Sequence, residues 1–132
     1  MTVTHRFPCR VYYEDTDAGG IVYHANYLRF TERARTEFLR EHGIHQHTLA
    51  QEHGVLFVVA KCSMTYIAPA HLDDWLEVLT SVHSKSPLRL ILTQDIVRTR
   101  QKIFTSLVTL ACINTSGRAC PLPACINKII QN

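Results

Sequence analysis

Two acids and two glycines within six residues form the segment of this sequence best equipped for chemistry. They lie in the run Asp15-Thr16-Asp17-Ala18-Gly19-Gly20, and a mostly apolar stretch, 21–28, follows at once. Aspartates in turns often do no more than accept backbone hydrogen bonds. A loop carboxylate beside glycines that admit a ligand can instead act as a general base or as a nucleophile. Both roles are therefore considered for these two acids.

The residues after the glycines predict a helix that positions this loop. Apolar residues recur at helical spacing in Tyr27, Phe30, Ala34 and Phe38. They predict a helix over about residues 25–42, with Asn26 as its N-cap and Gly43 as its stop. A helix N-terminus offers free N–H groups and partial positive charge, which can stabilise an oxyanion and keep a nearby carboxylate ionised. A carboxylate beside such a terminus is the minimal equipment for attacking a thioester, whose thiolate leaving group needs no strong general acid.

The remaining elements are mostly strands. A first strand is expected over residues 5–13, with Phe7, Cys9, Val11 and Tyr13 on one side, and a short helix over 46–53. Later segments with strand character cover residues 55–67, 75–82, 88–97 and 103–113. One amphipathic helix must bury its apolar stripe against the only available sheet. We therefore expect an α+β fold, a single domain over residues 1–132, with a curved antiparallel sheet wrapped around one long helix. The uncovered sheet face predicts a dimer or a higher oligomer.

Composition excludes several classes of protein. With 46% hydrophobic and 19% charged residues in 132, the chain has the balance of a folded domain. The net charge of +3 comes from scattered basic residues, so we expect no nucleic-acid partner. Five cysteines without paired spacing favour a reducing compartment. The start, Met1 to Arg6, opens no apolar run and no stretch is long enough to span a bilayer, so a cytoplasmic location without membrane insertion is expected.

Metal binding is not expected. Four histidines, His42, His45, His47 and His53, cluster in the sequence but lack ligand spacing and accompanying acids. No Ser-His-Asp set and no cysteine nucleophile with its base can be recognised. The sequence therefore predicts chemistry without a metal and without a redox cofactor.

A resemblance to a known family sharpens this interpretation. The run from Arg10 to Tyr27, continued by 30–37, closely resembles the Tol–Pal-associated acyl-CoA thioesterases. These are enzymes of the 4-hydroxybenzoyl-CoA thioesterase type in the hotdog superfamily. Further resemblance lies in Phe57-Val58-Val59 and over residues 66–74, and it is weakest after about Ser116. It covers most of the chain, and it implies the hotdog fold but gives no evidence of contact with the Tol–Pal system.

The resemblance implies a role for particular residues. Asp17 matches the catalytic carboxylate, as nucleophile or general base, and Asp15 is interpreted as a turn-former. Gly20 matches the glycine that allows the thioester to approach, and the backbone N–H of His24 would point at the thioester oxygen. The His24 side chain either orients water or substrate or fills the loop. Candidate substrate-binding residues are Tyr13, Ile21, Val22, Tyr23, Tyr27, Lys61 and Arg89. Tyr23 and Tyr27 suit core or pocket wall, and Lys61 and Arg89 suit either coenzyme A phosphates or a solvated surface.

The predicted function is hydrolysis of small-to-medium acyl-CoA to the free acid and coenzyme A. The site is expected at a subunit interface of a homodimer or homotetramer, as the resemblance implies. One alternative is a hotdog dehydratase, for which His24 has no obvious helix-borne glutamate partner. Another is a non-enzymatic acyl-CoA sensor or cell-envelope scaffold, which would gain little from a charged Asp17 at the thioester. Aliphatic, aromatic and carrier-protein-bound acyl groups all remain open.

Overall fold

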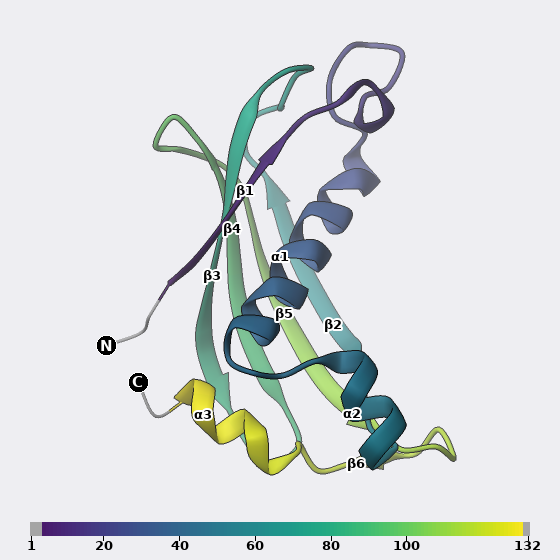
Figure 1. Cartoon of the computed structure of the whole chain (residues 1–132). Helices are drawn as coiled ribbons and strands as arrows, with labels where there is room; N and C mark the ends of the chain where they lie inside the picture. The colour runs from purple at the N-terminus through teal and green to yellow at the C-terminus, as the bar shows by residue number, and fades with distance from the viewer. Residues whose placement is uncertain (1–3, 131–132) are drawn as a thin grey trace.

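One long helix lies in the concave face of a strongly curved antiparallel sheet (Figure 1). The computed structural model describes residues 4–130. Met1–Val3, part of the segment expected to hold no signal peptide, lie outside the described residues, as do Gln131 and Asn132. Among the described residues, no helix combines the length and the apolar character needed to cross a membrane.

The sheet follows the order β1-β3-β4-β5-β2, and every pairing is antiparallel. Its strands are β1 (His5–Arg10), β2 (Leu56–Tyr66), β3 (Trp75–Lys85), β4 (Leu90–Arg98) and β5 (Gln101–Ile113). A short strand β6 (Ala119–Cys120) pairs with the end of β5. The two edge strands of the main sheet are therefore β1 and β2, although they are consecutive strands in the chain.

The helices differ in length and in what they cover. The long helix α1 (Tyr27–Glu41) crosses the sheet, and α2 (Gln46–His53) follows it near the start of β2. Short 3-10 turns η1 (Tyr13–Asp15), η2 (His24–Asn26) and η3 (Ala124–Ile126) lie in the connections, and α3 (Asn127–Ile130) follows η3. No described helix covers the convex face of the sheet, as Figure 1 shows.

The apolar stripe of α1 divides the core into two clusters. Tyr27, Phe30 and Ala34 pack in one cluster near the start of the helix, and Phe38 and Leu39 pack in the other near its end. All five side chains are buried, and full burial of one large apolar side chain stabilises a fold by about 1.5–3 kcal/mol. These contacts fix α1 on the sheet and so fix where its N-terminus lies.

The expected elements are present, and their ends differ in informative ways. The helix begins at Tyr27 rather than Ala25, because η2 forms a tighter turn first. Asn26 occupies the N-cap position of α1 as predicted, but its side chain makes no capping hydrogen bond. The first strand ends at Arg10, and Tyr13 lies in η1, 84% exposed, rather than on a strand face. Gly43 does end the helix, with φ +79° and its N–H bonded to Arg40.

Candidate active site

The acidic loop folds into a tight hairpin that presents Asp17 to solvent. The Asp17 N–H donates to Ile21 O (2.9 Å), the Gly20 N–H donates to Asp17 O (3.0 Å), and Thr16 pairs with Val22. Gly20 has φ +81°, a left-handed conformation that favours glycine, and space is open where a Cβ would stand. The turn therefore leaves room beside the Asp17 side chain for a ligand to approach.

One oxygen of Asp17 is fixed and the other is free. Oδ1 accepts the N–H of Gly19 at 2.8 Å, and a Cβ on Gly19 would stand 3.3 Å from that oxygen. No hydrogen bond to Oδ2 is found within residues 4–130. Asp17 is therefore an exposed carboxylate whose direction is set by the turn and whose second oxygen can accept a proton or attack a carbon.

Asp15 has a different task, because its side chain is buried and fully engaged. Oδ1 accepts from the Asn26 side chain and Oδ2 from the Tyr12 N–H, both at 2.8 Å. Its carbonyl accepts the Tyr23 N–H at 3.0 Å. The residue thus ties both ends of the loop to the start of α1, as expected of a turn-former.

The hairpin is docked onto the connection between β2 and β3. Val22 N–H donates to Ala70 O (2.9 Å), Ile21 pairs with His71, and the Ala70 N–H donates to the Tyr27 hydroxyl (3.1 Å). Val22 and Tyr27 are each 3% exposed. These two candidate substrate-binding residues lie in the core of one chain, where they support the loop from below.

The start of the helix lies directly after the hairpin and carries free donors. Among residues 4–130, no acceptor is found for the backbone N–H groups of His24 and Ala25. The His24 carbonyl, in contrast, accepts a hydrogen bond from the Tyr66 hydroxyl at 2.7 Å. Tyr66 packs edge-on against Tyr27 (5.2 Å) and Phe104 (5.3 Å), so the far end of β2 holds this turn in place.

Exposed aromatic and apolar side chains lie in the hairpin and in the segments that precede it and support it. The exposed fractions are 84% for Tyr13, 50% for Tyr23, 44% for Tyr66 and 53% for Ile67. The Tyr23 ring lies 4.7 Å from the His24 ring, and His24 itself is exposed. Contiguous exposed apolar surface marks ligand or protein contacts. We therefore refer to Tyr13, Ile21, Tyr23, Tyr66 and Ile67 as the aromatic rim of the site.

The two predicted phosphate-binding cations lie apart from this loop. Lys61 is exposed on edge strand β2. Arg89 lies between β3 and β4, whereas the Asp17 hairpin is at the opposite end of the sheet (Figure 1). Arg89 bonds locally, its N–H to Ser86 Oγ (3.1 Å) and its Nη1 to Leu88 O (3.0 Å). A single chain does not bring either cation to Asp17.

An ion pair braces the segment beneath the hairpin. Arg98 Nη1 donates to Asp74 Oδ2 (2.7 Å) and to Pro69 O (2.9 Å), and the His71 N–H donates to the same carboxylate oxygen (2.8 Å). Burial acts to raise the pKa of Asp74, but the His71 and Arg98 hydrogen bonds outweigh it and hold the pKa below its ordinary value. Within residues 4–130, no three His, Cys, Asp or Glu side chains are grouped to hold a metal ion.

Sequence reasoning missed two of these residues. Tyr66 lies far from the loop in sequence, and nothing in its local pattern predicts a bond to His24. Asn26 carried a signal, since a polar residue stood inside an apolar run, but helix capping was the simpler interpretation. The structure shows that its amide instead binds Asp15.

Comparison with known proteins places these features in a family. The sequence model of the thioesterase-like superfamily matches residues 11–130. The acyl-CoA thioester hydrolase YbgC of Escherichia coli O6:H1 is 48% identical over 114 residues, covering 86% of this chain and 84% of that protein. The acyl-CoA thioesterase YbgC of Haemophilus influenzae is 45% identical over 108 residues, covering 82% and 79%. The crystal structure of a probable thioesterase from Bartonella henselae superposes with a TM-score of 0.88 at 37% identity, covering 92% of this chain and all of that one.

Proposed function

The chain belongs to the thioesterase-like superfamily and is an acyl-CoA thioesterase, and we propose that Asp17 supplies the carboxylate for hydrolysis of small-to-medium acyl-CoA thioesters. The resemblance to acyl-CoA thioesterases and the expected hotdog fold are confirmed by these matches. The observation that carries the proposal is the hairpin itself. It fixes one oxygen of an exposed carboxylate, leaves the other free, and leads directly into a turn with free N–H groups.

In the proposed reaction, a thioester lies against the start of η2 with its carbonyl oxygen facing the His24 N–H. Asp17 Oδ2 takes a proton from water, and the water oxygen attacks the carbonyl carbon. The backbone donor stabilises the negative oxygen of the tetrahedral intermediate. The C–S bond then breaks, coenzyme A leaves as a thiolate, the acid is released, and Asp17 passes its proton to the thiolate or to solvent.

A nucleophilic route uses the same atoms in a different order. Asp17 Oδ2 attacks the thioester carbon and forms a mixed anhydride as the thiolate leaves. Water then cleaves the anhydride and restores the carboxylate. Both routes require a charged, accessible Asp17, so both predict the same effect of removing its charge.

The site is proposed to be completed by a second copy of the chain. The aromatic rim exposes large apolar side chains beside Asp17, and the edge strand β2 exposes Leu56 and Val59 along its length. An open strand edge and exposed apolar surface both favour association. We infer a homodimer or homotetramer with the acyl-CoA, or an acyl carrier protein thioester, bound at the subunit boundary.

The proposal also covers the cellular compartment and the domain organisation of the chain. All five cysteines are free in the structure, a state that a reducing compartment maintains. We propose that the chain acts in the cytoplasm, as a single domain over residues 1–132.

The deciding experiment compares steady-state release of free thiol by the wild type and by Asp17→Asn. The substrates are a panel of acyl-CoAs and one acyl carrier protein thioester. Asn keeps the shape but not the charge, so kcat/KM is expected to fall by about 100-fold or more. Asp73→Asn is the matched control, because Asp73 is exposed, has φ +72°, and Asn tolerates that conformation. An Asp17→Asn protein as active as the wild type, or no hydrolysis of any thioester, would contradict the mechanism.

A further inference from the structure

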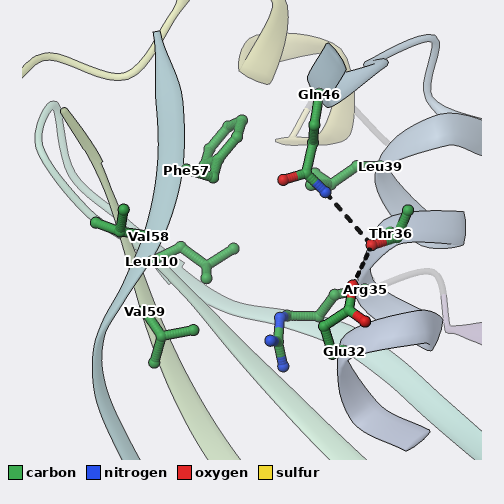
Figure 2. Close-up of a pocket in the computed structure, with 9 residues that line it drawn as sticks. All are labelled: Glu32, Arg35, Thr36, Leu39, Gln46, Phe57, Val58, Val59 and Leu110. Carbon is green, nitrogen blue, oxygen red and sulfur yellow. Dashed lines mark hydrogen bonds between the residues drawn. The ribbon is translucent and has the colours of Figure 1, made fainter. Parts of the chain in front are cut away.

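A second polar site lies further along α1, away from the Asp17 hairpin. A cavity of about 200 Å³ opens between the middle of α1, the start of α2 and strands β2 and β5 (Figure 2). Its apolar wall consists of Leu39, Phe57, Val58, Val59 and Leu110. Its polar wall consists of Glu32, Arg35, Thr36 and Gln46. Arg35 lies about 12 Å along the helix axis from Tyr27, at 1.5 Å per residue.

Arg35 is held in place by a buried amide. Its Nη1 donates to Gln94 Oε1 at 3.0 Å. Gln94 is completely buried, and its Nε2 donates to Thr31 O (3.0 Å) and to Thr80 Oγ1 (2.9 Å). Because both of those acceptors fix which way the amide faces, the Gln94 oxygen must point at Arg35. The guanidinium is therefore positioned by the interior of the protein.

The guanidinium nevertheless retains unused donors. It carries five N–H groups, and the Gln94 bond is the one hydrogen bond found for it within residues 4–130. No carboxylate in that range lies within ion-pairing distance of it. The nearby Glu32 accepts instead from Thr36 Oγ1 (2.8 Å), which in turn accepts from Gln46 Nε2 (3.4 Å), as the dashed lines in Figure 2 show.

Electrostatics favours an anion against these donors. Burial lowers the pKa of the Arg35 guanidinium, an effect opposed by Glu32 and Cys62. A partly desolvated cation without an ion-pair partner is costly, and a carboxylate that meets the planar fork relieves that cost. Glu32 is exposed, so solvent screens its charge. The facing wall of Phe57, Val59 and Leu110 suits a hydrocarbon chain rather than a phosphate.

We propose that this cavity binds a carboxylate carried on an apolar chain, with Arg35 as the anchor of the carboxylate. The origin of the carboxylate rests on the proposed function. It is either the far-end carboxylate of a dicarboxylic acyl group in the substrate or the free acid that hydrolysis releases. The chemistry recognised by the cavity is the same in both cases.

The first test measures binding without any thioester. Sodium hexanoate is titrated into the isotope-labelled protein, and NMR shifts and intermolecular NOEs are followed at the Arg35 Nε and the Phe57 ring. Saturable changes at both positions are expected. Arg35→Met should weaken binding by about tenfold or more, the loss expected for a charge-assisted hydrogen bond. Arg33→Met, on the exposed side of the same helix, should leave the affinity unchanged.

Further probes keep this test decisive if Arg35→Met fails to fold. Hexanamide, the neutral isostere, should bind the wild-type protein about tenfold more weakly than hexanoate. Arg35→Lys keeps the charge but not the planar guanidinium, and its affinity for hexanoate should lie between those of the wild type and of Arg35→Met. Absent changes at Phe57, or equal binding of hexanoate and hexanamide, would overturn the proposal. Because no hydrolysis is involved, this result is independent of the role of Asp17.

Hydrolysis then separates the two sources of the carboxylate. Dodecanedioyl-CoA and dodecanoyl-CoA have acyl chains of equal length, long enough to reach from the start of α1 over the roughly 12 Å to Arg35, and differ in the terminal carboxylate. If the substrate supplies the carboxylate, Arg35→Met raises KM for dodecanedioyl-CoA about tenfold and leaves dodecanoyl-CoA unchanged. If the released acid supplies it, hexanoate inhibits the wild type and inhibits Arg35→Met about tenfold less strongly. Failure of both patterns would overturn a role for the cavity in this reaction.

Discussion

At the scale of single residues, Asp15 and Asp17 are nearly adjacent in sequence, but their different burial gives them different roles. Asp15 is 6% exposed, and both of its carboxylate oxygens accept hydrogen bonds from the loop and the start of α1. Asp17 is exposed, and only one of its carboxylate oxygens accepts a hydrogen bond. A buried carboxylate that accepts a protein hydrogen bond at each oxygen cannot turn toward a substrate as a base without breaking the loop. The hydrogen-bond pattern therefore assigns support to Asp15 and leaves Asp17 available for chemistry.

The two glycines of the hairpin should respond differently to an added methyl group. Gly20→Ala meets open space but φ +81°, so it should lower the free energy of unfolding by about 1–2 kcal/mol. Gly19→Ala has no such strain, but its Cβ would stand 3.3 Å from Asp17 Oδ1 and displace the carboxylate. We expect kcat to fall about tenfold with the urea midpoint unchanged. Urea unfolding and thiol release check both variants, and equal kcat for Gly19→Ala and wild type would argue against a fixed Asp17 geometry.

At the scale of elements, the far end of β2 and the start of α1 form one unit. The Tyr66 hydroxyl binds the His24 carbonyl at 2.7 Å, although the two residues are distant in sequence. A donor on this carbonyl fixes the turn that leads into the helix and so holds the His24 N–H, which lies on the preceding peptide, in its direction. Tyr66 acts through that turn, so we regard it as a positioning residue.

Tyr66→Phe should therefore lower kcat by about fivefold to tenfold, corresponding to one hydrogen bond, with KM nearly unchanged. The ring contacts with Tyr27 and Phe104 are kept, so thermal stability should change little. Steady-state kinetics and a thermal melt distinguish the two effects. A large drop in melting temperature with normal kcat would show that Tyr66 is only structural.

The Asp74–Arg98 ion pair joins the residue just before β3 to the end of β4. This ion pair should make the stability of the fold depend on pH. Burial opposes ionisation of Asp74, but the His71 N–H and Arg98 lower its pKa below 3.8 in the folded state. The stability that it contributes is thus complete above about pH 3.8, the value for the unfolded chain, and is lost as pH falls through the lower folded pKa. Urea unfolding should show Asp74→Asn less stable than wild type at pH 6, with the gap closing toward pH 2. A gap independent of pH would refute this origin.

Local sequence patterns predict the helices of the fold, whereas the contacts between distant segments are not predicted. The spacing of Phe30, Ala34 and Phe38 is a local signal, and α1 lies within two residues of its predicted bounds. The second helix is found at Gln46–His53 as expected. The Tyr66–His24 bond and the position of Arg89 depend on how β2 and β4 are registered against other strands. Such long-range register is not encoded in any single segment, so these relations emerge only in the fold.

At the scale of the whole molecule, the two edges of the sheet are unequal. Edge strand β1 has six residues and includes Pro8, which lacks an N–H and blunts pairing. Edge strand β2 has 11 residues without proline and is largely exposed. An open edge of this length is a template for a further strand, so β2 is the edge at which a second copy is expected to pair.

Ala60→Pro should disrupt this pairing while sparing the chain itself. The register of β2 on β5 shifts between Val59 and Lys61, so Ala60 has no partner on β5, and prolines are tolerated at such bulges. We expect the wild type to sediment as a multiple of 15.1 kDa and Ala60→Pro to shift toward the single-chain mass. Thioesterase activity should fall with the loss of association, because the aromatic rim then faces water instead of a partner, while circular dichroism remains unchanged. An Ala60→Pro protein that keeps the wild-type mass would exclude β2 as the pairing edge, and a fully active monomer would show that one chain carries the complete site.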